Sequence, residues 1–521
     1  MALKEKEPVE EKRERRTEEG EQEEQRRSVL GNIEVVYDEQ MQRNAITPSS
    51  VKYVVQHFYD RLRKGYPDSF SLLLLGPPGV GKSTAVREAA EEIAAQLGKR
   101  FVDITSREER ERVFRELEDC LVESGDLQTC VKKLNYFLFM YLNLITVVTP
   151  EELRGKPYIV SREHRREEAI RQSPQDWAVS EFFERMELSP PDWAKLFRLF
   201  PGILYLDEFT NVQREDVMIA ARRLLLSKAA GFTKLNDEVL VVAAGNLPQH
   251  APGIARPLPV TILTRCHVWY VTKPKLEDWY EWMISKISRF SDDLRSELLE
   301  TLNFIYLHLV NNRGDFLNLE EAKRSAKSVN FPTPRSWSNL VFSYPMRVLR
   351  SLVSQPEALI GALSSFVGPT VARKLAVAVS RYTVVPYKDI LADPDALDRY
   401  LESLGKDASM ALIYLVAGLP MRILEFKPSP DVVRRIAEKV YSNGVKYTGD
   451  PGFGCTLVEA LGTALSKLPH ALELSDSERA YVTAVATAVS EVWSRMGCRP
   501  DNALMRIAKK RADALGSGAQ R

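Results

Sequence analysis

The sequence predicts an α/β domain built on a parallel sheet, followed by a small helical region and a C-terminal all-helical domain. Short segments that are apolar throughout alternate with helical patterns in the first half of the chain. Strands without polar alternation are buried on both faces, as in a parallel sheet that helices cover on both sides. From about residue 340 onward, amphipathic helical patterns alternate with proline and glycine turns, and no strand-rich segment follows.

The elements of the α/β domain can be placed along the chain. A helix is expected after the Thr47-Pro48 cap, because proline is favoured at the first helical position. A second helix is expected over residues 83–97, ending at Gly98. The expected strands are residues 72–75, 100–104, 136–148, 203–206, 239–244 and 268–271.

The first of these strands runs into a glycine-rich loop that fits the pattern G-x-x-x-x-G-K-[ST]. In such a loop the backbone N–H groups point at a phosphate, and the helix that follows directs its dipole at the same anion. We expect Lys82 to reach the β- and γ-phosphates of ATP, and Ser83 to supply a hydroxyl to Mg²⁺. The alternative is a glycine-rich turn with an incidental lysine. The candidate nucleotide-binding residues are Gly76, Pro77, Pro78, Gly79, Val80, Gly81, Lys82, Ser83 and Thr84.

A second apolar strand ends in two acids, Asp207 and Glu208. A phosphate loop needs such acids beside it, because one can hold the Mg²⁺ shell while the other polarises a water for attack on the γ-phosphate. We therefore assign the metal role to Asp207, with Ser83, and the general-base role to Glu208. Two solvated acids at a strand end would be the alternative, but the loop upstream favours the catalytic pair. The sequence thus predicts hydrolysis as well as binding.

The composition argues against several other classes of protein. Lys and Arg total 72 against 71 Asp and Glu, a net charge of +1, so no overall field draws the chain to nucleic acid or to an anionic membrane. The longest apolar stretch, residues 136–148, is too short for a bilayer, which needs about 20 residues. The five cysteines show no C-x-x-C pair, so we expect reduced thiols in a cytoplasmic protein without a membrane partner.

Five motifs together resemble one family. Residues 76–84 and 206–208 resemble the Walker A and Walker B motifs of the AAA+ ATPases. Residues 241–248 resemble the sensor 1 segment, and residues 331–337 resemble the P-R-x-W form of sensor 2. Leu258-Pro259 with Leu263-Thr264-Arg265 is similar to the L-P…L-x-R-F segment of the MoxR-like branch, which is related to the helix-2-insert and chelatase proteins. The order and rough spacing match over residues 45–345.

The resemblance implies further catalytic residues. Asn246 would orient the attacking water, although an Asx turn before Pro248 is the alternative role. Arg265 would reach across a subunit interface as an arginine finger, with Arg256 as a competing candidate and an ordinary surface arginine as the alternative. Arg335 would contact the γ-phosphate from the lid of the same subunit, unless it forms a structural salt bridge.

The finger segment departs from the family pattern. The usual aromatic after the arginine is Cys266 here, and the usual acid before it is Thr264, which weakens the assignment of Arg265.

The expected domains follow from these assignments. Residues 1–30 read as a charged, disordered tail, residues 31–272 as the α/β domain, 273–345 as a helical lid and 346–515 as a C-terminal helical domain. Insertions are expected near residues 106–133 and 154–191, the second with a basic run at 162–166 and Trp177. Residues 231–234 form either a substrate-facing turn or a simple αβ loop.

A MoxR-like AAA+ protein would hydrolyse ATP with Mg²⁺, assemble into a homo-oligomeric ring, expected to be hexameric, and act as a chaperone-like remodeller of a protein client. The client would be a protein with a von Willebrand factor A domain. Two other readings stay open: a nucleic-acid-stimulated motor or GTP-dependent restriction-type translocase, and a nucleotide switch that does not hydrolyse. Neutral charge and the lack of a recognisable helix-turn-helix argue against a nucleic-acid partner.

Overall fold

The protein forms two compact units in a computed structural model, which describes residues 33–38, 41–66, 71–161, 184–250, 255–319, 330–382 and 385–498. The first unit extends to Pro274 and the second begins at Lys275. The expected tail at residues 1–30, the basic run at 162–166 and Trp177 lie outside the described residues. Each unit is described below by itself.

The first unit is built on a six-stranded sheet in which every pairing is parallel, so the predicted parallel sheet is confirmed. The strand order is β12-β3-β11-β8-β5-β4. The strand expected over residues 136–148 is shorter, because the chain leaves it at Asn143 for a single 3-10 turn over Leu144–Thr146. The strands are β3 (Ser71–Leu75), β4 (Arg100–Asp103), β5 (Tyr136–Asn143), β8 (Gly202–Asp207), β11 (Val239–Gly245) and β12 (Cys266–Tyr270).

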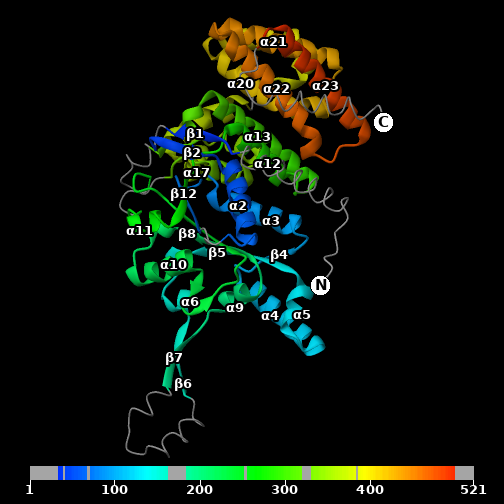
Figure 1. Ribbon diagram of the computed structural model, residues 1–521. Helices are drawn as coiled ribbons and strands as arrows, with labels where there is room; N and C mark the ends of the chain where they lie inside the picture. Colours follow the sequence, from blue (N-terminus) through cyan, green and yellow to red (C-terminus); the bar gives the residue numbers. More distant parts are fainter. Residues whose placement is uncertain are drawn as a thin grey trace, which may run out of the picture. The chain divides into compact units, whose positions relative to one another are not determined.

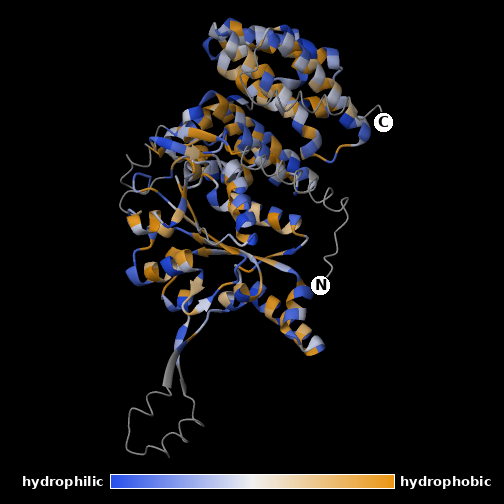
Figure 2. Ribbon diagram, in the orientation of Figure 1, coloured by the Kyte–Doolittle hydropathy of each residue, from blue (hydrophilic) through white to orange (hydrophobic). Residues whose placement is uncertain are grey.

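Helices cover both faces of this sheet (Figure 1). On one face lie α2 (Pro48–Arg63) and α3 (Lys82–Gln96), and on the other lie α9 (Asp192–Leu199) and α10 (Glu215–Ser227). Figure 2 shows orange along the central strands and mixed orange and blue on the helices, as expected when only one side of each helix meets the sheet. The two short helices are α6 (Glu151–Arg154) and α11 (Val260–Leu263).

In the part of the chain that the structure describes, three β-hairpins lie outside the sheet, and the sequence did not predict them. They are β1–β2 (Val35–Asp38 and Arg43–Ile46), β6–β7 (Lys156–Ser161 and Glu184–Ser189) and β9–β10 (Ala229–Ala230 and Thr233–Lys234). The β6–β7 hairpin, within the expected insertion at 154–191, projects away from the sheet (Figure 1). Long-range pairing of this kind leaves no turn signature in the sequence, since the two strands are far apart along the chain.

The expected insertion at 106–133 is helical. It contains α4 (Arg107–Ser124), which the Ser106 side chain caps by accepting a hydrogen bond from the Glu109 N–H, and α5 (Leu127–Leu134). Asp126 caps α5 by accepting bonds from the first-turn N–H groups. Gly125, in the left-handed conformation, ends α4, and the Asp126 cap starts α5 at the next residue, which produces the helical hairpin.

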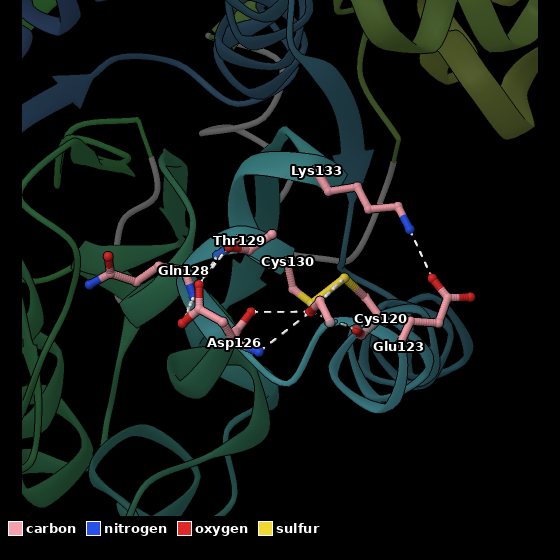
Figure 3. Close-up of a disulfide and its surroundings, with 8 residues drawn as sticks. Cys120, Glu123, Asp126, Gln128, Thr129, Cys130 and Lys133 are labelled. Atoms are coloured by element: carbon pink, nitrogen blue, oxygen red, sulfur yellow. Dashed lines mark hydrogen bonds and ion pairs between the residues drawn. A yellow bond between two sulfur atoms is a disulfide. The ribbon is translucent and has the colours of Figure 1, made fainter.

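The expectation of reduced thiols is wrong for four of the five cysteines. Cys120 of α4 is bonded to Cys130 of α5, next to the Lys133–Glu123 ion pair (Figure 3). In the second unit Cys455 is bonded to Cys498. The pairing depends on the Cα–Cα separation, 5.7 Å for each pair, which sequence spacing does not reveal.

The second unit is helical, and no strand occurs among its described residues, which confirms the prediction for the last third of the chain. One apolar cluster runs from Leu276 to Cys498 and includes Trp337 with no exposed surface. This cluster spans residue 345, where the sequence suggested a division between lid and C-terminal domain, and that division stays a prediction. The helices are α12 (Leu276–Ile287), α13 (Asp292–Asn311), α15 (Pro334–Ser343), α16 (Met346–Ser351), α17 (Pro356–Tyr382), α18 (Tyr387–Ala392), α19 (Asp395–Leu404), α20 (Ala408–Phe426), α21 (Pro430–Thr448), α22 (Pro451–Ala471) and α23 (Asp476–Arg495).

Two helical segments of this unit, Pro356–Tyr382 and Asp395–Phe426, are long and apolar enough to cross a membrane by length and composition. Half or more of the most apolar stretch of each is buried, 50% and 61%. Core helices pass the same test, so this composition is weak evidence for a membrane span.

Candidate nucleotide-binding site

The carboxyl ends of neighbouring parallel strands bring the predicted residues together. Because β11 lies between β3 and β8, the chain leaving β11 at Asn246 lies between the phosphate loop and the two acids. The register pairs Gly245 with Leu75 and Ala243 with Leu206, so all three strands end at a similar level. Ligands of open α/β sheets bind at this edge.

The phosphate loop leads directly into α3, whose first residue is Lys82. Gly81, the residue before it, has φ 106°, a conformation that glycine adopts without strain. Gly76 has no room for a side chain, because a Cβ there would lie 2.0 Å from the Val271 carbonyl oxygen. The loop is therefore held close to β12, and the positive end of the α3 dipole faces the anion site.

The Lys82 ammonium lies inside this loop. Its Nζ donates to the carbonyl oxygens of Gly76, at 3.0 Å, and Pro77, at 2.8 Å. The residue is only 8% exposed, and a longer contact of 3.5 Å joins Nζ to Asn246 Oδ1. A charged group held at the loop by weak neutral acceptors can exchange them for phosphate oxygens, which are stronger partners for an ammonium.

Glu208 contacts the amide nitrogen of Asn246, whose amide oxygen faces Lys82. Asn246 Nδ2 donates to Glu208 Oε2 at 3.3 Å, and the amide of Asn211 donates to the same oxygen. The backbone of Glu208 is left-handed, with φ 56° and ψ 32°, which is uncommon for a residue with a side chain and common at functional sites. The structure thus brings Lys82, Asn246 and Glu208 into one connected group, as the motifs predicted.

Asp207 is held by three donors. Tyr141 Oη donates to Oδ2 at 2.8 Å, while the Glu208 N–H and the Tyr205 hydroxyl donate to Oδ1 at 2.9 Å and 3.4 Å. Burial, and then the nearby Asp207 carboxylate, raise the pKa of Tyr205 well above its usual value, so its phenol stays protonated. The Ser83 hydroxyl acts in the opposite direction and lowers this pKa, which places it beside the Tyr205 phenol. The sequence analysis missed both tyrosines, although Tyr205 is two residues before Asp207 in one strand and so shares its face.

These oxygens fit the cation that accompanies nucleotides. Mg²⁺ prefers carboxylate and other hard oxygen ligands and keeps several waters. The Asp207 carboxylate and the Ser83 hydroxyl are both linked to Tyr205, which places the two predicted metal residues at one point of the site.

The two candidate finger arginines differ in their surroundings. Arg256 is exposed and donates to Gln213 Oε1 at 2.8 Å. Arg265 is also exposed, directly after α11, and its guanidinium has no partner among the residues that the structure describes. An exposed arginine without a partner among the described residues is suited to a contact with another molecule.

Arg335 belongs to the second unit and is exposed at the second position of α15. The Thr333 and Ser336 side chains form a capping box around this helix start. The helix is well anchored, because Trp337 Nε1 donates to the Asp315 carbonyl oxygen at 2.9 Å.

Residues 231–234 are part of a tight hairpin and not a simple αβ loop. The turn between β9 and β10 consists of Gly231 and Phe232, and the Phe232 ring is 66% exposed. Arg223 of α10 lies 5.6 Å from the centre of that ring. Gly231 has φ 59°, and a Cβ there would lie 2.2 Å from the Arg154 carbonyl oxygen, so the hairpin is closely packed at its base.

Comparison with known proteins agrees with this geometry. Residues 72–256 match the family model of the ATPase family associated with various cellular activities (AAA). The match contains the phosphate loop, both acids and Asn246 but less than half of the 521 residues, so it describes the domain and not the whole chain. Together with the six-stranded parallel sheet, it confirms the predicted fold class, and the first unit contains an AAA P-loop domain.

One solved structure aligns with two thirds of this chain. This structure, the FIGL-1 AAA domain in complex with ADP, aligns over 67% of this chain and 87% of its own at 15% identity. Its TM-score is 0.25, too low to carry an argument about this chain. No curated protein matches the sequence.

Proposed function

We propose that this protein is an ATP-hydrolysing AAA+ ATPase of MoxR-like type that works as a ring and remodels a partner protein. One observation carries the ATPase part of the proposal. Asn246 joins the phosphate-loop lysine to the carboxylate of Glu208, while Asp207 lies with Ser83 on the metal side. This arrangement supports turnover, because a site for binding alone would not need a second carboxylate connected to the phosphate-loop lysine through Asn246.

The side chains then have distinct roles. Lys82 gives up its carbonyl partners and binds the β- and γ-phosphates, while the N–H groups of the loop surround them. Mg²⁺, when bound, neutralises charge that develops on the phosphates. The Asn246 amide orients a water, and Glu208 accepts its proton as the water oxygen attacks the γ-phosphorus and the bond to the β-γ bridging oxygen breaks. Asn211 and Asn246 keep the Glu208 carboxylate in place before ATP arrives.

The finer assignments have separate support. The MoxR-like branch, the hexameric ring and the von Willebrand factor A client come from the sequence resemblance, and the cytoplasmic location comes from the cysteine pattern alone. The exposed Arg265 without a partner among the described residues supports a finger in trans. The exposed Phe232 at the tip of a rigid hairpin supports a contact with the client.

The test is Glu208→Gln. This change removes the proton acceptor but keeps the size of the side chain and one oxygen that can accept the hydrogen bonds of Asn211 and Asn246. We expect ATP binding to persist and phosphate release to fall by about 100-fold or more, since general-base catalysis typically contributes 10²–10⁴-fold. Glu215→Gln, an exposed acid in the first turn of α10, is the matched control. Unchanged phosphate release by the Glu208 variant would support the nucleotide-switch reading instead.

The same variant identifies the partner. An ATP-bound ring that cannot turn over should retain its client, and a copurifying protein with a von Willebrand factor A domain would support the remodelling role. Stimulation of hydrolysis by DNA or RNA, with GTP preferred over ATP, would replace it with the translocase reading.

A further inference from the structure

Two tyrosines from neighbouring strands surround the carboxylate at the metal side of the site. Tyr141 is on β5 and Tyr205 is on β8, and the parallel register pairs these two residues directly. Their ring centres lie 5.7 Å apart. Tyr141 donates to Asp207 Oδ2 at 2.8 Å, and Tyr205 donates to Oδ1 at 3.4 Å.

The pleat of the sheet explains why the three side chains meet. Alternate residues of a strand point to the same face, so Tyr205 and Asp207 project to one side of β8, and the registered Tyr141 projects to that side too. This is the face that α3 covers, since Arg87 of α3 lies 5.9 Å from the Phe139 ring, two residues before Tyr141. The tyrosines therefore lie beside the start of α3, where the Ser83 hydroxyl is close enough to Tyr205 to lower its pKa.

We propose that Tyr141 is a positioning residue for the metal, because its phenol fixes the Asp207 carboxylate in the orientation that serves nucleotide-bound Mg²⁺. This inference depends on the proposed nucleotide site. The Oδ1 oxygen has its own donors in Tyr205 and the Glu208 N–H, whereas the phenol of Tyr141 donates to Oδ2. Without that phenol the carboxylate can turn about its last bond. Outer-shell partners of this kind usually change metal affinity by about 10- to 100-fold when they are removed.

The experiment measures binding and needs no turnover. A fluorescent ATP analogue is titrated into the full chain at a series of Mg²⁺ concentrations, and again in EDTA. For Tyr141→Phe we expect the Mg²⁺ concentration that gives half-maximal enhancement of binding to rise about tenfold. Binding in EDTA and the thermal midpoint should stay as in the parent protein, because the ring and its packing are kept.

Tyr136→Phe is the matched control. Tyr136 lies on the same strand, is fully buried, and its hydroxyl has no hydrogen-bond partner among the described residues. Its removal should leave the Mg²⁺ midpoint unchanged. A second test combines Tyr141→Phe with Asp207→Asn, and Tyr141→Phe should then add no further shift if it acts through Asp207.

Three results would overturn the inference. The first is an unchanged Mg²⁺ midpoint in Tyr141→Phe, and the second is an equal loss of binding with and without Mg²⁺, which would indicate a structural role. The third is an additional shift in the Asp207→Asn background. Failure of the parent protein to bind the analogue at all is a different outcome, since it would remove the proposed function and the inference together.

Discussion

Replacing Asn246 by alanine tests whether this side chain orients the chemistry or only closes a turn. The substitution deletes the donor to Glu208 Oε2, at 3.3 Å, and the acceptor for Lys82, at 3.5 Å. The backbone N–H of residue 246 would keep its bond to Thr210 Oγ1, at 2.9 Å, so the local chain should stay in place. The change therefore isolates the amide.

The two lost contacts predict effects of different size. A hydrogen bond to a charged group contributes about 1.5–3 kcal/mol, which corresponds to about 10- to 150-fold in rate if it acts only in the transition state. The Lys82 contact is at the long limit for a hydrogen bond, and Lys82 keeps two carbonyl partners, so nucleotide affinity should change by less than about tenfold. We expect the loss to appear in kcat and not in binding.

The assay is phosphate release at saturating ATP, together with equilibrium binding of a fluorescent ATP analogue. Asn339→Ala is the matched control, because Asn339 is exposed on α15 and alanine is favourable in a helix. Wild-type kcat in Asn246→Ala would refute the positioning role and favour the Asx-turn interpretation. A loss of binding as large as the loss of rate would also refute it, because the side chain would then stabilise ground state and transition state equally.

Two further predictions concern the cysteines. Thiol titration of the protein denatured without reductant should find one reactive thiol, because four cysteines are paired and Cys266 is free. After reduction it should find five. Five thiols before reduction would contradict the two disulfides and support the reduced cysteines expected from the sequence. Burial raises the pKa of Cys266 from 9.0 to about 11, because it disfavours the charged thiolate. Alkylation of Cys266 in the native protein at pH 8 should therefore be about 100-fold slower than alkylation of an exposed thiol. Its rate should increase with pH up to about pH 11. Alkylation by iodoacetamide between pH 7 and 10 measures this, and a rate that is already maximal near pH 9 would contradict the burial argument.

Several features could be predicted because the residues responsible for them are close in sequence. The phosphate loop needs only a strand, glycines at fixed spacing and a lysine that begins a helix, and Gly76 and Gly81 have the constrained surroundings that the pattern implies. The adjacent acids Asp207 and Glu208 could be found for the same reason. The β6–β7 hairpin could not be predicted, since it pairs residues such as Lys156 and Ser189 across a long intervening segment.

By itself, the sequence determined the strand-loop-helix unit, the parallel character of the sheet and the all-helical second unit, because local periodicity and turn residues encode them. The tertiary structure alone decided which side chains surround these motifs. Tyr141 contacts Asp207 only through the register of β5 on β8, and Asn246 contacts Glu208 only because β11 lies beside β8. Cys120 and Cys130 pair because α4 and α5 fold back on each other. Such contacts depend on how separate elements pack, and no spacing along the chain records that.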